Sequence, residues 1–407
     1  MGLRVASFTS LGSDELGTER LTLLAQLAVY LINAAAVFSP PMAQIIVGTL
    51  FLFFITLTLL PLSRHKVWWV RGADFPRLQL VAVGVAVLAA SVALLDTEKG
   101  VVRAMMVATV VGVAYQSWWI LPYTFLHTPE VKGATPPLAD DRLRILSANI
   151  LMTNERHEDV VALIRQEQPD VVILLETNAQ WARALAVVKE ELPHVLACPL
   201  ENLYGMHLYS RFPIEDPKIQ FLVEKEVPSF HLLLILPSQR RVELHCLHPA
   251  PPSPTENESS NERDAELIMV GRAVADSDYA MVVTGDLNDV AWSPTTRLFR
   301  KISGLLDPRV GRGLFNTFSA RCALMRWPVD HFFISREFTL IGLKRLAACG
   351  SDHFPVLIDL ALTPAEAHTQ QGLTPDAEDH ADARAHMAKE GVSESEVHLP
   401  KTTSGRT

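Results

Sequence analysis

Long apolar runs without any charged residue dominate the first part of the chain. They comprise residues 21–38, 42–62, 78–95 and 104–123. Each run is close to the roughly 20 residues that a helix needs to cross a bilayer. Helices of a soluble bundle would show a polar face, which these runs lack. The pattern therefore predicts about four membrane-spanning helices within residues 1–125.

The fourth run is the weakest of these predictions, because Gln116 interrupts it. Its end carries Trp118, Trp119 and Tyr123, and such side chains favour the membrane–water boundary. We favour four spans over three, and the choice decides which side of the membrane the rest of the chain faces.

The loop between the second and third runs is rich in basic residues. It holds Arg64, Lys66, Arg71 and Arg77 against the single acidic residue Asp74. The positive-inside rule places this loop in the cytoplasm. With four spans, both termini are then cytoplasmic, so we expect a multi-pass protein of the cell (inner) membrane with a cytoplasmic catalytic domain.

A soluble α/β domain is predicted over residues 142–362, after a Pro- and Thr-containing linker at 126–141. Apolar runs typical of strands alternate with helical segments. Asn154 can cap the first of these helices and Pro169 stops it, and the others fall near 177–192, 261–276 and 293–303. The run "DVVILLE" is continuously apolar, so we expect a central strand. Residues 363–407 are polar with few large apolar side chains, and we expect a disordered tail.

Composition adds two restrictions. The net charge is -9 and no basic stripe is evident, which argues against a protein that collects nucleic-acid phosphates non-specifically. The four cysteines form no C-x-x-C pair, so a metal knuckle or a redox motif is not expected. They are Cys198, Cys246, Cys322 and Cys349.

The predicted strands end in polar residues that are able to bind a metal ion. These are Asn149, Glu176, His248, Asp286, Asn288, Asp330, Asp352 and His353. Any one of them alone is best explained by a turn or a helix cap. Together they indicate one site, because buried carboxylates need compensation and a hard divalent cation with oxygen ligands is a common kind.

In order along the chain, these motifs resemble the endonuclease/exonuclease/phosphatase superfamily. They are Asn149, Glu176, His248, G-D-L-N at 285–288, V-D-H at 329–331 and S-D-H-F-P-V at 351–356, with Y-S-R-F-P-I at 209–214. The superfamily includes DNase-I-like nucleases, sphingomyelinases and inositol-phosphate phosphatases. The resemblance covers residues 142–362 and implies a two-sheet α/β sandwich of the DNase-I-like kind, preceded here by the transmembrane helical region.

The resemblance also implies roles for single residues. Glu176 would be the main Mg²⁺ ligand, with Mn²⁺ as the alternative ion. Asn149 would hold the metal or a phosphate oxygen, and Asp352 would lie near the metal or shape its water shell.

The remaining roles concern the phosphate and the attacking water. Asp286 would orient or deprotonate the water, and Asn288 would hold that water or a phosphate oxygen. His353 and His248 would contact the phosphate from two sides, with Asp330 orienting His353. Near this set, Arg312, Asn316 and Thr317 are weaker candidates for lining the substrate cleft, and a structural role of this loop explains them equally well. His245 and His331 face the opposite side of their strands and are expected to be structural.

The sequence thus predicts a membrane-anchored, Mg²⁺-dependent phosphoesterase whose substrate is a lipid or another membrane-proximal phosphoester. A nuclease is the alternative. It is disfavoured by the acidic net charge, by Leu151 at a position where some abasic-site nucleases carry an acidic residue, and by the presence of His248. A second alternative is a non-catalytic membrane scaffold, which would predict loss of some site residues. No obligate protein partner is evident, and the absence of charge within the spans argues against a transporter.

Overall fold

The computed structural model describes residues 39–135 and 141–401, and the chain forms two compact units. Of the described residues, 39–59 and 78–117 belong to the first unit, while 60–77, 118–135 and 141–401 belong to the second. The first predicted span, 21–38, lies outside the described residues. The second unit contains the predicted catalytic domain, but it also takes in the loop between two spans, which differs from the predicted domain boundaries.

The first unit is built from long apolar helices. They are α2 (Pro40–Leu59), α4 (Arg77–Leu94) and α5 (Gly100–Ile120), and each is long and apolar enough to cross a membrane. Their positions agree with the second, third and fourth predicted runs. Pro40 and Pro41 begin α2, where proline is tolerated because the backbone amides of the first helical turn have no partner within the helix.

Small and polar residues explain how these helices pack. The ring of Phe54 is fully buried against Gly84 and Gly112, where a Cβ atom would come within 3.0 and 2.7 Å of ring carbons. Gln116, which interrupts the fourth run, donates through its side-chain amide to the hydroxyl of Thr58 at 3.2 Å. The polar group is therefore satisfied between two helices, as the apolar surroundings require.

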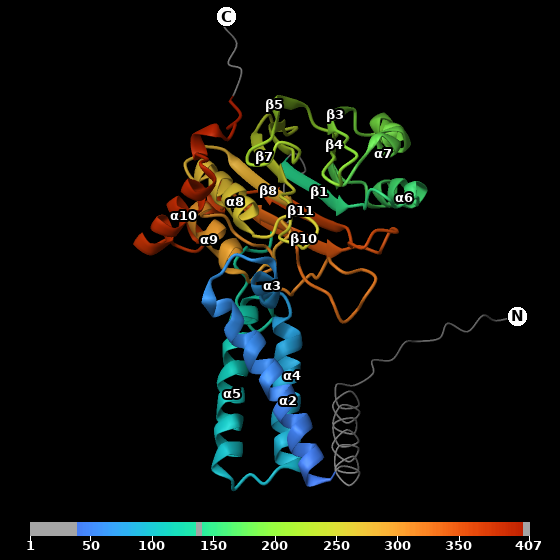
Figure 1. The fold of residues 1–407 in the computed structure, drawn as a ribbon. Coiled ribbons are helices and arrows are strands. Elements are labelled where there is room, and N and C mark those ends of the chain that lie inside the picture. Colours follow the sequence, from blue (N-terminus) through green and yellow to red (C-terminus); the bar gives the residue numbers. More distant parts are fainter. Residues whose placement is uncertain (1–38, 136–140, 402–407) are drawn as a thin grey trace, which may run out of the picture. The chain divides into compact units, whose positions relative to one another are not determined.

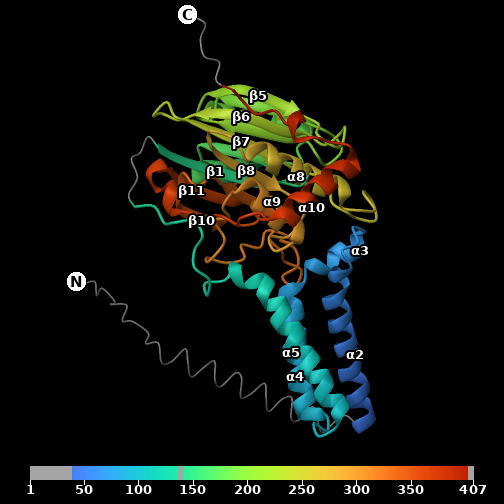
Figure 2. The ribbon, with the colours of Figure 1, turned by 90° about the vertical axis from the view of Figure 1, so that its left-hand side faces the viewer.

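The second unit contains two mixed β-sheets packed face to face (Figures 1 and 2). The six-stranded sheet has the order β10-β11-β1-β2-β4-β3 and the five-stranded sheet the order β5-β6-β7-β8-β9. The strands of the first sheet are β1 (Arg142–Asn149), β2 (Val171–Leu175), β3 (His194–Cys198), β4 (Met206–Ser210), β10 (Phe338–Arg345) and β11 (Val356–Leu362). Those of the second are β5 (Ile214–Gln220), β6 (Ser229–Ile235), β7 (Arg241–Leu247), β8 (Ala280–Asp286) and β9 (Asp330–Ile334).

The α/β sandwich predicted from the sequence is confirmed. One apolar core fills the space between the sheets, with Ile145 and Ile173 from one sheet and Leu232 and Val282 from the other. Strand β2 is central, between β1 and β4, as its continuous apolar run predicts. Strands β3, β4, β5 and β10 were not predicted, because none of them has a long continuous apolar run.

Helices cover the outer faces of the two sheets. Helices α6 (His157–Glu167) and α7 (Ala179–Ala184) pack on the first sheet, and α8 (Asn261–Val274) and α9 (Pro294–Ser303) pack on the second (Figure 1). Trp181 on α7 and Phe299 on α9 are fully buried in these outer cores.

The predicted disordered tail is corrected by the structure. Residues Ala377–Glu390 form helix α10, which begins with a capping box at Asp376 and packs on α8 and α9. Its buried residues, Ala383 and Met387, join the outer core over the second sheet. Two apolar residues on one face are enough to hold α10 in place, because they pack on an apolar surface that α8 and α9 already provide. The composition of the tail does not reveal that this surface exists.

Candidate active site

The candidate site lies where parallel strands end at one edge of the sandwich. Asn149 is the last residue of β1, and Glu176 follows the end of β2, which runs parallel to β1. Asp286 ends β8, and His248 follows the end of its parallel neighbour β7. Carboxyl ends of parallel strands meet at the same edge of a sheet, so four residues that are far apart in the sequence come together.

Hydrogen bonds link the acidic residues through Asn149. Its side-chain amide donates to Glu176 Oε1 at 2.6 Å and to Asp286 Oδ2 at 3.2 Å. The oxygen Oδ1 of Asn149 accepts from the backbone amide of Leu151 at 3.1 Å. Asn149 thus bridges the two carboxylates, and it would have to present Oδ1 instead to act as a metal ligand.

Two histidines face Asp286. Oδ2 of Asp286 lies 3.6 Å from His353 Nε2 and 3.9 Å from His248 Nε2. The other ring nitrogen of His353, Nδ1, lies 2.9 Å from Oδ2 of Asp330. Asp330 pairs with Asp286 across the antiparallel strands β8 and β9. Asp286, Asp330 and His353 offer ligand atoms that all lie within 4.8 Å of one another.

Burial shifts the protonation of this cluster. It raises the pKa of Glu176 to about 7 and also raises that of Asp286. Burial likewise lowers the pKa of His248 to about 4. For His353, burial alone would lower the pKa, but the nearby carboxylates of Asp330 and Asp286 raise it to about 10. The site therefore combines a protonated imidazole with a neutral one around buried carboxyl groups.

The backbone at the site adopts conformations that side chains rarely take. Glu176 has φ 61° and Asn288 has φ 50°, both in the left-handed region. Gly285, which begins the G-D-L-N motif, has φ 142°, and a Cβ atom there would come within 1.9 Å of the Leu247 carbonyl oxygen. Such conformations cost free energy and persist at sites where a side chain has to be aimed.

Asn288 holds the loop that carries Asp286. Its side-chain amide donates to the carbonyl of Pro249 at 3.1 Å, and its backbone amide donates to Asp286 Oδ1 at 3.0 Å. The carbonyl of Asn288 in turn accepts from the guanidinium of Arg263 at 2.6 Å. In this arrangement Asn288 fixes the G-D-L-N loop to the end of β7, beside His248.

The weaker candidates fall into different places. Thr317 is buried, and its hydroxyl accepts from the backbone amides of Val329 and Asp330, so it holds the strand start that carries Asp330. Arg312 donates to the carbonyls of Pro308 and Val131, which gives it a role in the fold of its loop.

Asp352 and Asn316 remain at the edge of the site. The carboxylate of Asp352 accepts from Ser351 at 3.4 Å and contributes to the raised pKa of His353. Asn316 accepts through its backbone carbonyl from Arg345 at 2.9 Å, and its side-chain oxygen is buried with no partner among the described residues. The structure does not bring either side chain into the hydrogen-bonded network around Asn149.

His245 and His331 are structural, as the strand alternation predicts. His245 is buried between His231 and Glu243, at 2.6 and 2.7 Å. His331 Nε2 lies 2.8 Å from the carbonyl of Asp289, directly after the G-D-L-N motif. Both rings therefore support the second sheet.

Sequence reasoning missed a group of buried ion pairs behind the site. Arg263 on α8 contacts Asp264 at 2.8 Å and Asp289 at 3.1 Å. Lys66 and Arg71, from the loop between two predicted spans, contact Asp264 at 3.2 Å and Asp289 at 3.9 Å. Asp289, which directly follows G-D-L-N, could have been noticed in the sequence as a further carboxylate near the site. Nothing in the sequence connects it with the distant loop that holds Lys66 and Arg71.

The donor set suits a hard divalent cation. Carboxylate oxygens of Glu176 and Asp286 converge on the amide of Asn149 in a buried place, where burial raises both carboxyl pKa values. A cation with oxygen ligands would compensate such buried negative charge, and Mg²⁺ needs only one or two carboxylates because it keeps several waters.

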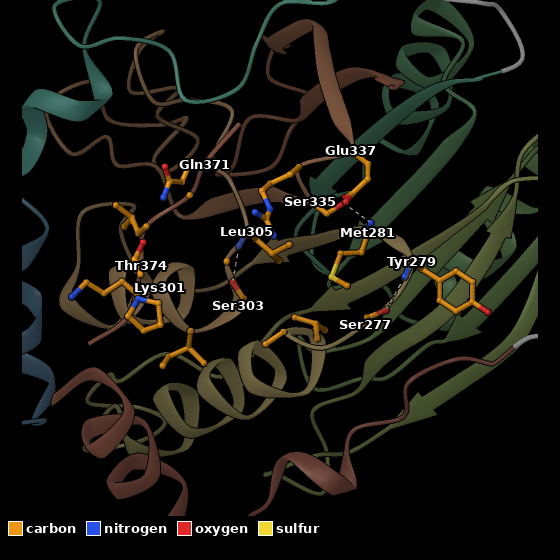
Figure 3. Close-up of a pocket in the computed structure, with 18 of the residues that line it drawn as sticks. Ser277, Tyr279, Met281, Lys301, Ser303, Leu305, Ser335, Glu337, Gln371 and Thr374 are labelled. Carbon is orange, nitrogen blue, oxygen red and sulfur yellow. Dashed lines mark hydrogen bonds between the residues drawn. The ribbon is translucent and has the colours of Figure 1, made fainter. Parts of the chain in front are cut away.

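A hollow of about 330 Å³ lies elsewhere in the second unit (Figure 3) and contains none of the predicted site residues. Its serines serve the local backbone. The hydroxyl of Ser335 accepts from the Met281 amide at 2.9 Å, and Ser277 and Ser303 accept from amides two residues on. We assign it no part in the chemistry.

Comparison with known proteins agrees with this geometry. The sequence model of the Endonuclease/Exonuclease/phosphatase family matches residues 146–353, just over half of the 407 residues. No curated protein matches the chain.

Solved structures that resemble the chain share little sequence with it. The catalytic domain of human Nocturnin with bound sulfate has 16% identity and a TM-score of 0.45, covering 56% of this chain and 96% of its own. TDP2 of D. rerio with a single-strand DNA product has 15% identity and a TM-score of 0.45, covering 54% and 99%. Sphingomyelinase C of Streptomyces griseocarneus has 16% identity and a TM-score of 0.42, covering 54% and 99%.

Proposed function

Because this chain belongs to the endonuclease/exonuclease/phosphatase family, we propose that it is a membrane-anchored, Mg²⁺-dependent phosphoesterase acting on a lipid or another membrane-proximal phosphoester. The family consists of hydrolases that act on phosphoester bonds and depend on divalent metal ions. The substrate, the identity of the metal and the membrane anchoring are our proposal.

One observation carries the proposal. Asn149, Glu176 and Asp286 form one hydrogen-bonded cluster, and His248 and His353 approach the same oxygen of Asp286. A phosphoester is anionic and repels nucleophiles, so hydrolysis needs charge neutralisation, a positioned water and stabilisation of the leaving oxygen. This cluster has a group for each task.

The residues divide these tasks as follows. Asp286, whose pKa is raised by burial, accepts a proton from the attacking water. The protonated His353 stabilises the charge that develops on the phosphate and gives its Nε2 proton to the leaving oxygen as the ester bond breaks, while Asp330 fixes the orientation of the ring through Nδ1. His248 contacts the phosphate as a neutral imidazole, and Asn288 keeps Asp286 in place.

Glu176 and Asn149 would hold the cation, with Asp352 at the outer edge of its water shell. When bound, a divalent cation supplies neutralisation of the phosphate charge. Mg²⁺ is the ion we expect, with Mn²⁺ as a substitute, because the ligands are oxygens. We give Arg312 no part in this site.

The segments that make up the second unit support a topology in which the loop Leu60–Arg77 and the catalytic domain lie on the same side of the membrane. The loop Leu60–Arg77 precedes α4 and α5, and the catalytic domain follows them, yet both belong to the same compact unit. Two membrane crossings return a chain to the side from which it started. We therefore propose that α4 and α5 both cross and that the loop and the catalytic domain share the cytoplasmic side, as the basic loop indicates.

The activity test uses the full chain reconstituted in lipid nanodiscs. We expect turnover of bis(4-nitrophenyl) phosphate with Mg²⁺, loss of it with EDTA, and recovery on adding Mg²⁺ or Mn²⁺. The variant Glu176→Gln should lose activity at least about 100-fold, since the main cation ligand is neutralised. Glu158→Gln, an exposed residue on α6, is the matched control. Full activity of Glu176→Gln, or activity indifferent to EDTA, would contradict the proposal.

A second arm of the same test compares substrates. Release of head groups from phospholipid vesicles is measured beside nicking of plasmid DNA by the same preparation. Faster nicking than head-group release would replace the lipid substrate with a nucleic acid.

The topology test uses a cysteine that the chain already has. Cys322 is exposed in the second unit, whereas Cys246 and Cys349 are buried. A membrane-impermeant maleimide should label the protein only after the cells are permeabilised, and Cys322→Ser should remove most of that labelling. Labelling of intact cells would place the catalytic domain on the outer side.

A further inference from the structure

A hollow of about 290 Å³ adjoins the candidate active site within the second unit. Asn288 and His353 line it on the side of the site. Most of the remaining wall is aromatic or apolar. We call this hollow the aromatic pocket and define it by Trp68, Phe75, Phe318, Trp327, Asn288 and His353.

The aromatic residues form a continuous path to the catalytic histidine. Phe75 contacts Trp327 edge to face, with ring centroids 5.5 Å apart. Trp327 stacks near Phe318 at 6.3 Å, and Phe318 lies 5.0 Å from the ring of His353. A ligand that fills the pocket therefore reaches the place where we propose the phosphate to bind.

One wall of the pocket comes from outside the family match. Trp68 and Phe75 lie in the loop Leu60–Arg77, whereas the family model begins at residue 146. Trp68 follows the apolar helix Pro40–Ser63 by five residues, and Phe75 precedes the helix that begins at Arg77 by two. The membrane-proximal part of the chain thus contributes directly to the site.

This wall is held firmly in place. The backbone amide of Trp68 donates to the carbonyl of Glu258 at 3.0 Å, and the indole of Trp292 donates to the carbonyl of Asp74 at 2.8 Å. The buried guanidinium of Arg71 lies 3.1 Å from Asp74. Fixed backbone contacts and buried ion pairs define a preformed surface, as a ligand site needs.

The polar groups of the pocket decide what kind of ligand it suits. Arg71 is engaged with Asp74, the amide of Asn288 donates to Pro249, and Nδ1 of His353 is bound to Asp330. The indole nitrogen of Trp327 and Nε of Arg71 have no hydrogen-bond partner among the described residues. A nucleobase presents several donors and acceptors at its edge, and these two donors would leave its other polar groups buried without partners. A hydrocarbon chain has no such cost.

We propose that the aromatic pocket binds the hydrocarbon chain of an amphiphilic, lipid-like phosphoester whose phosphate lies beside His353. This inference rests on the proposed function and specifies its substrate class. Continuity with the site, an aromatic lining, and a wall built from a segment between two membrane-span candidates support this occupant.

The test measures inhibition by a homologous series of phosphonates. Methyl-, butyl-, hexyl- and octylphosphonate compete with turnover of bis(4-nitrophenyl) phosphate by the full chain in nanodiscs, because detergent chains would themselves occupy the pocket. We expect the inhibition constant to fall by up to about fourfold for each methylene that the pocket buries. Trp68→Ala should remove most of this dependence on chain length while methylphosphonate still inhibits.

Matched variants distinguish binding of the inhibitor in the aromatic pocket from general damage to the protein and from partition of the inhibitor into the bilayer. Trp69→Ala changes an exposed neighbour that does not line the pocket, and it should retain the wild-type dependence. Trp68→Phe keeps an aromatic wall and should retain most of it. An inhibition constant that is independent of chain length in the wild type, or equal dependence in Trp68→Ala, would overturn the inference. Stronger Trp68-dependent inhibition by a nucleoside monophosphate than by hexylphosphonate would also overturn it.

Failure of the proposed function would look different. It would appear as absence of metal-dependent turnover in the wild type. In that case the same phosphonates are titrated by intrinsic tryptophan fluorescence, which requires no turnover. Chain-length-dependent binding that is weakened in Trp68→Ala then supports the pocket, and its absence refutes it.

Discussion

Oδ2 of Asp330 lies 2.9 Å from Nδ1 of His353, and both residues are buried at the edge of the sandwich. Asp330 begins β9, while His353 precedes β11 of the other sheet. The pair therefore joins the two sheets at the candidate site. It leaves Nε2 of His353 facing Asp286, which is the arrangement that a charge-stabilising imidazole needs.

Asp330→Asn should lower kcat/KM for a phosphodiester by about 100-fold or more, because the neutral amide no longer favours the protonated form of His353. The fold should be retained, since the two side chains have the same shape. Steady-state kinetics and far-UV circular dichroism check the two statements. Asp276→Asn, at an exposed site after α8, is the control. Activity of Asp330→Asn within twofold of the wild type would remove Asp330 from the site.

Arg71→Ala should lower the free energy of unfolding of the second unit by about 3 kcal/mol. The substitution removes a buried cation from Asp74 and Asp289. Each carboxylate keeps another arginine, Arg77 or Arg263, so we expect the lower end of the range for broken buried pairs. Thermal unfolding in nanodiscs gives the measurement. Arg64→Ala, whose side chain is 80% exposed, should be neutral. A catalytic fragment that lacks residues 60–77 should be destabilised for the same reason.

From the environment of His207 we expect the second unit to lose stability in mild acid. Burial lowers its pKa to about 4 in the folded protein, while the unfolded value is about 6.5. As the pH falls below 6.5, the unfolded chain binds a proton that the folded chain does not. Stability is therefore lost until the pH passes about 4, and the loss between pH 7 and pH 5 amounts to about 2 kcal/mol.

The variant His207→Gln tests this sign. Chemical unfolding at pH 7 and pH 5 should show a smaller difference in the variant than in the wild type. The exposed His368→Gln should keep the wild-type difference. If His207→Gln loses as much stability in acid as the wild type, His207 does not carry the effect.

Met387→Ala should lower the free energy of unfolding by about 2 kcal/mol, because Met387 of α10 is 5% exposed and packs in the outer core over the second sheet. Arg384→Ala, exposed on the same helix, should change it little. Hydrogen exchange of α10 amides offers an independent measurement. If these amides exchanged at the rate of an unstructured peptide, the tail would be disordered, as its composition suggested.

The sequence by itself determined which segments are apolar helices and which are buried strands. Charge-free runs of about 20 residues and the continuous run at β2 report local burial, so α2, α4, α5 and β2 could be predicted from them. The eight polar residues at strand ends could be found as well. The convergence of Asn149, Glu176, His248 and Asp286 needs only that parallel strands end at a common edge.

The tertiary structure alone decided what surrounds that site. Lys66 and Arg71 look like free positive charges at a membrane surface, yet they lie in buried ion pairs behind the G-D-L-N loop. Arg71 and its hydrogen-bond partner Thr295 are 224 positions apart. Periodicity along a chain reports the environment of each element, but it carries no information about which distant surface covers it. Partnerships of that kind arise only when the whole chain folds, since each is selected by shape and charge across the contact.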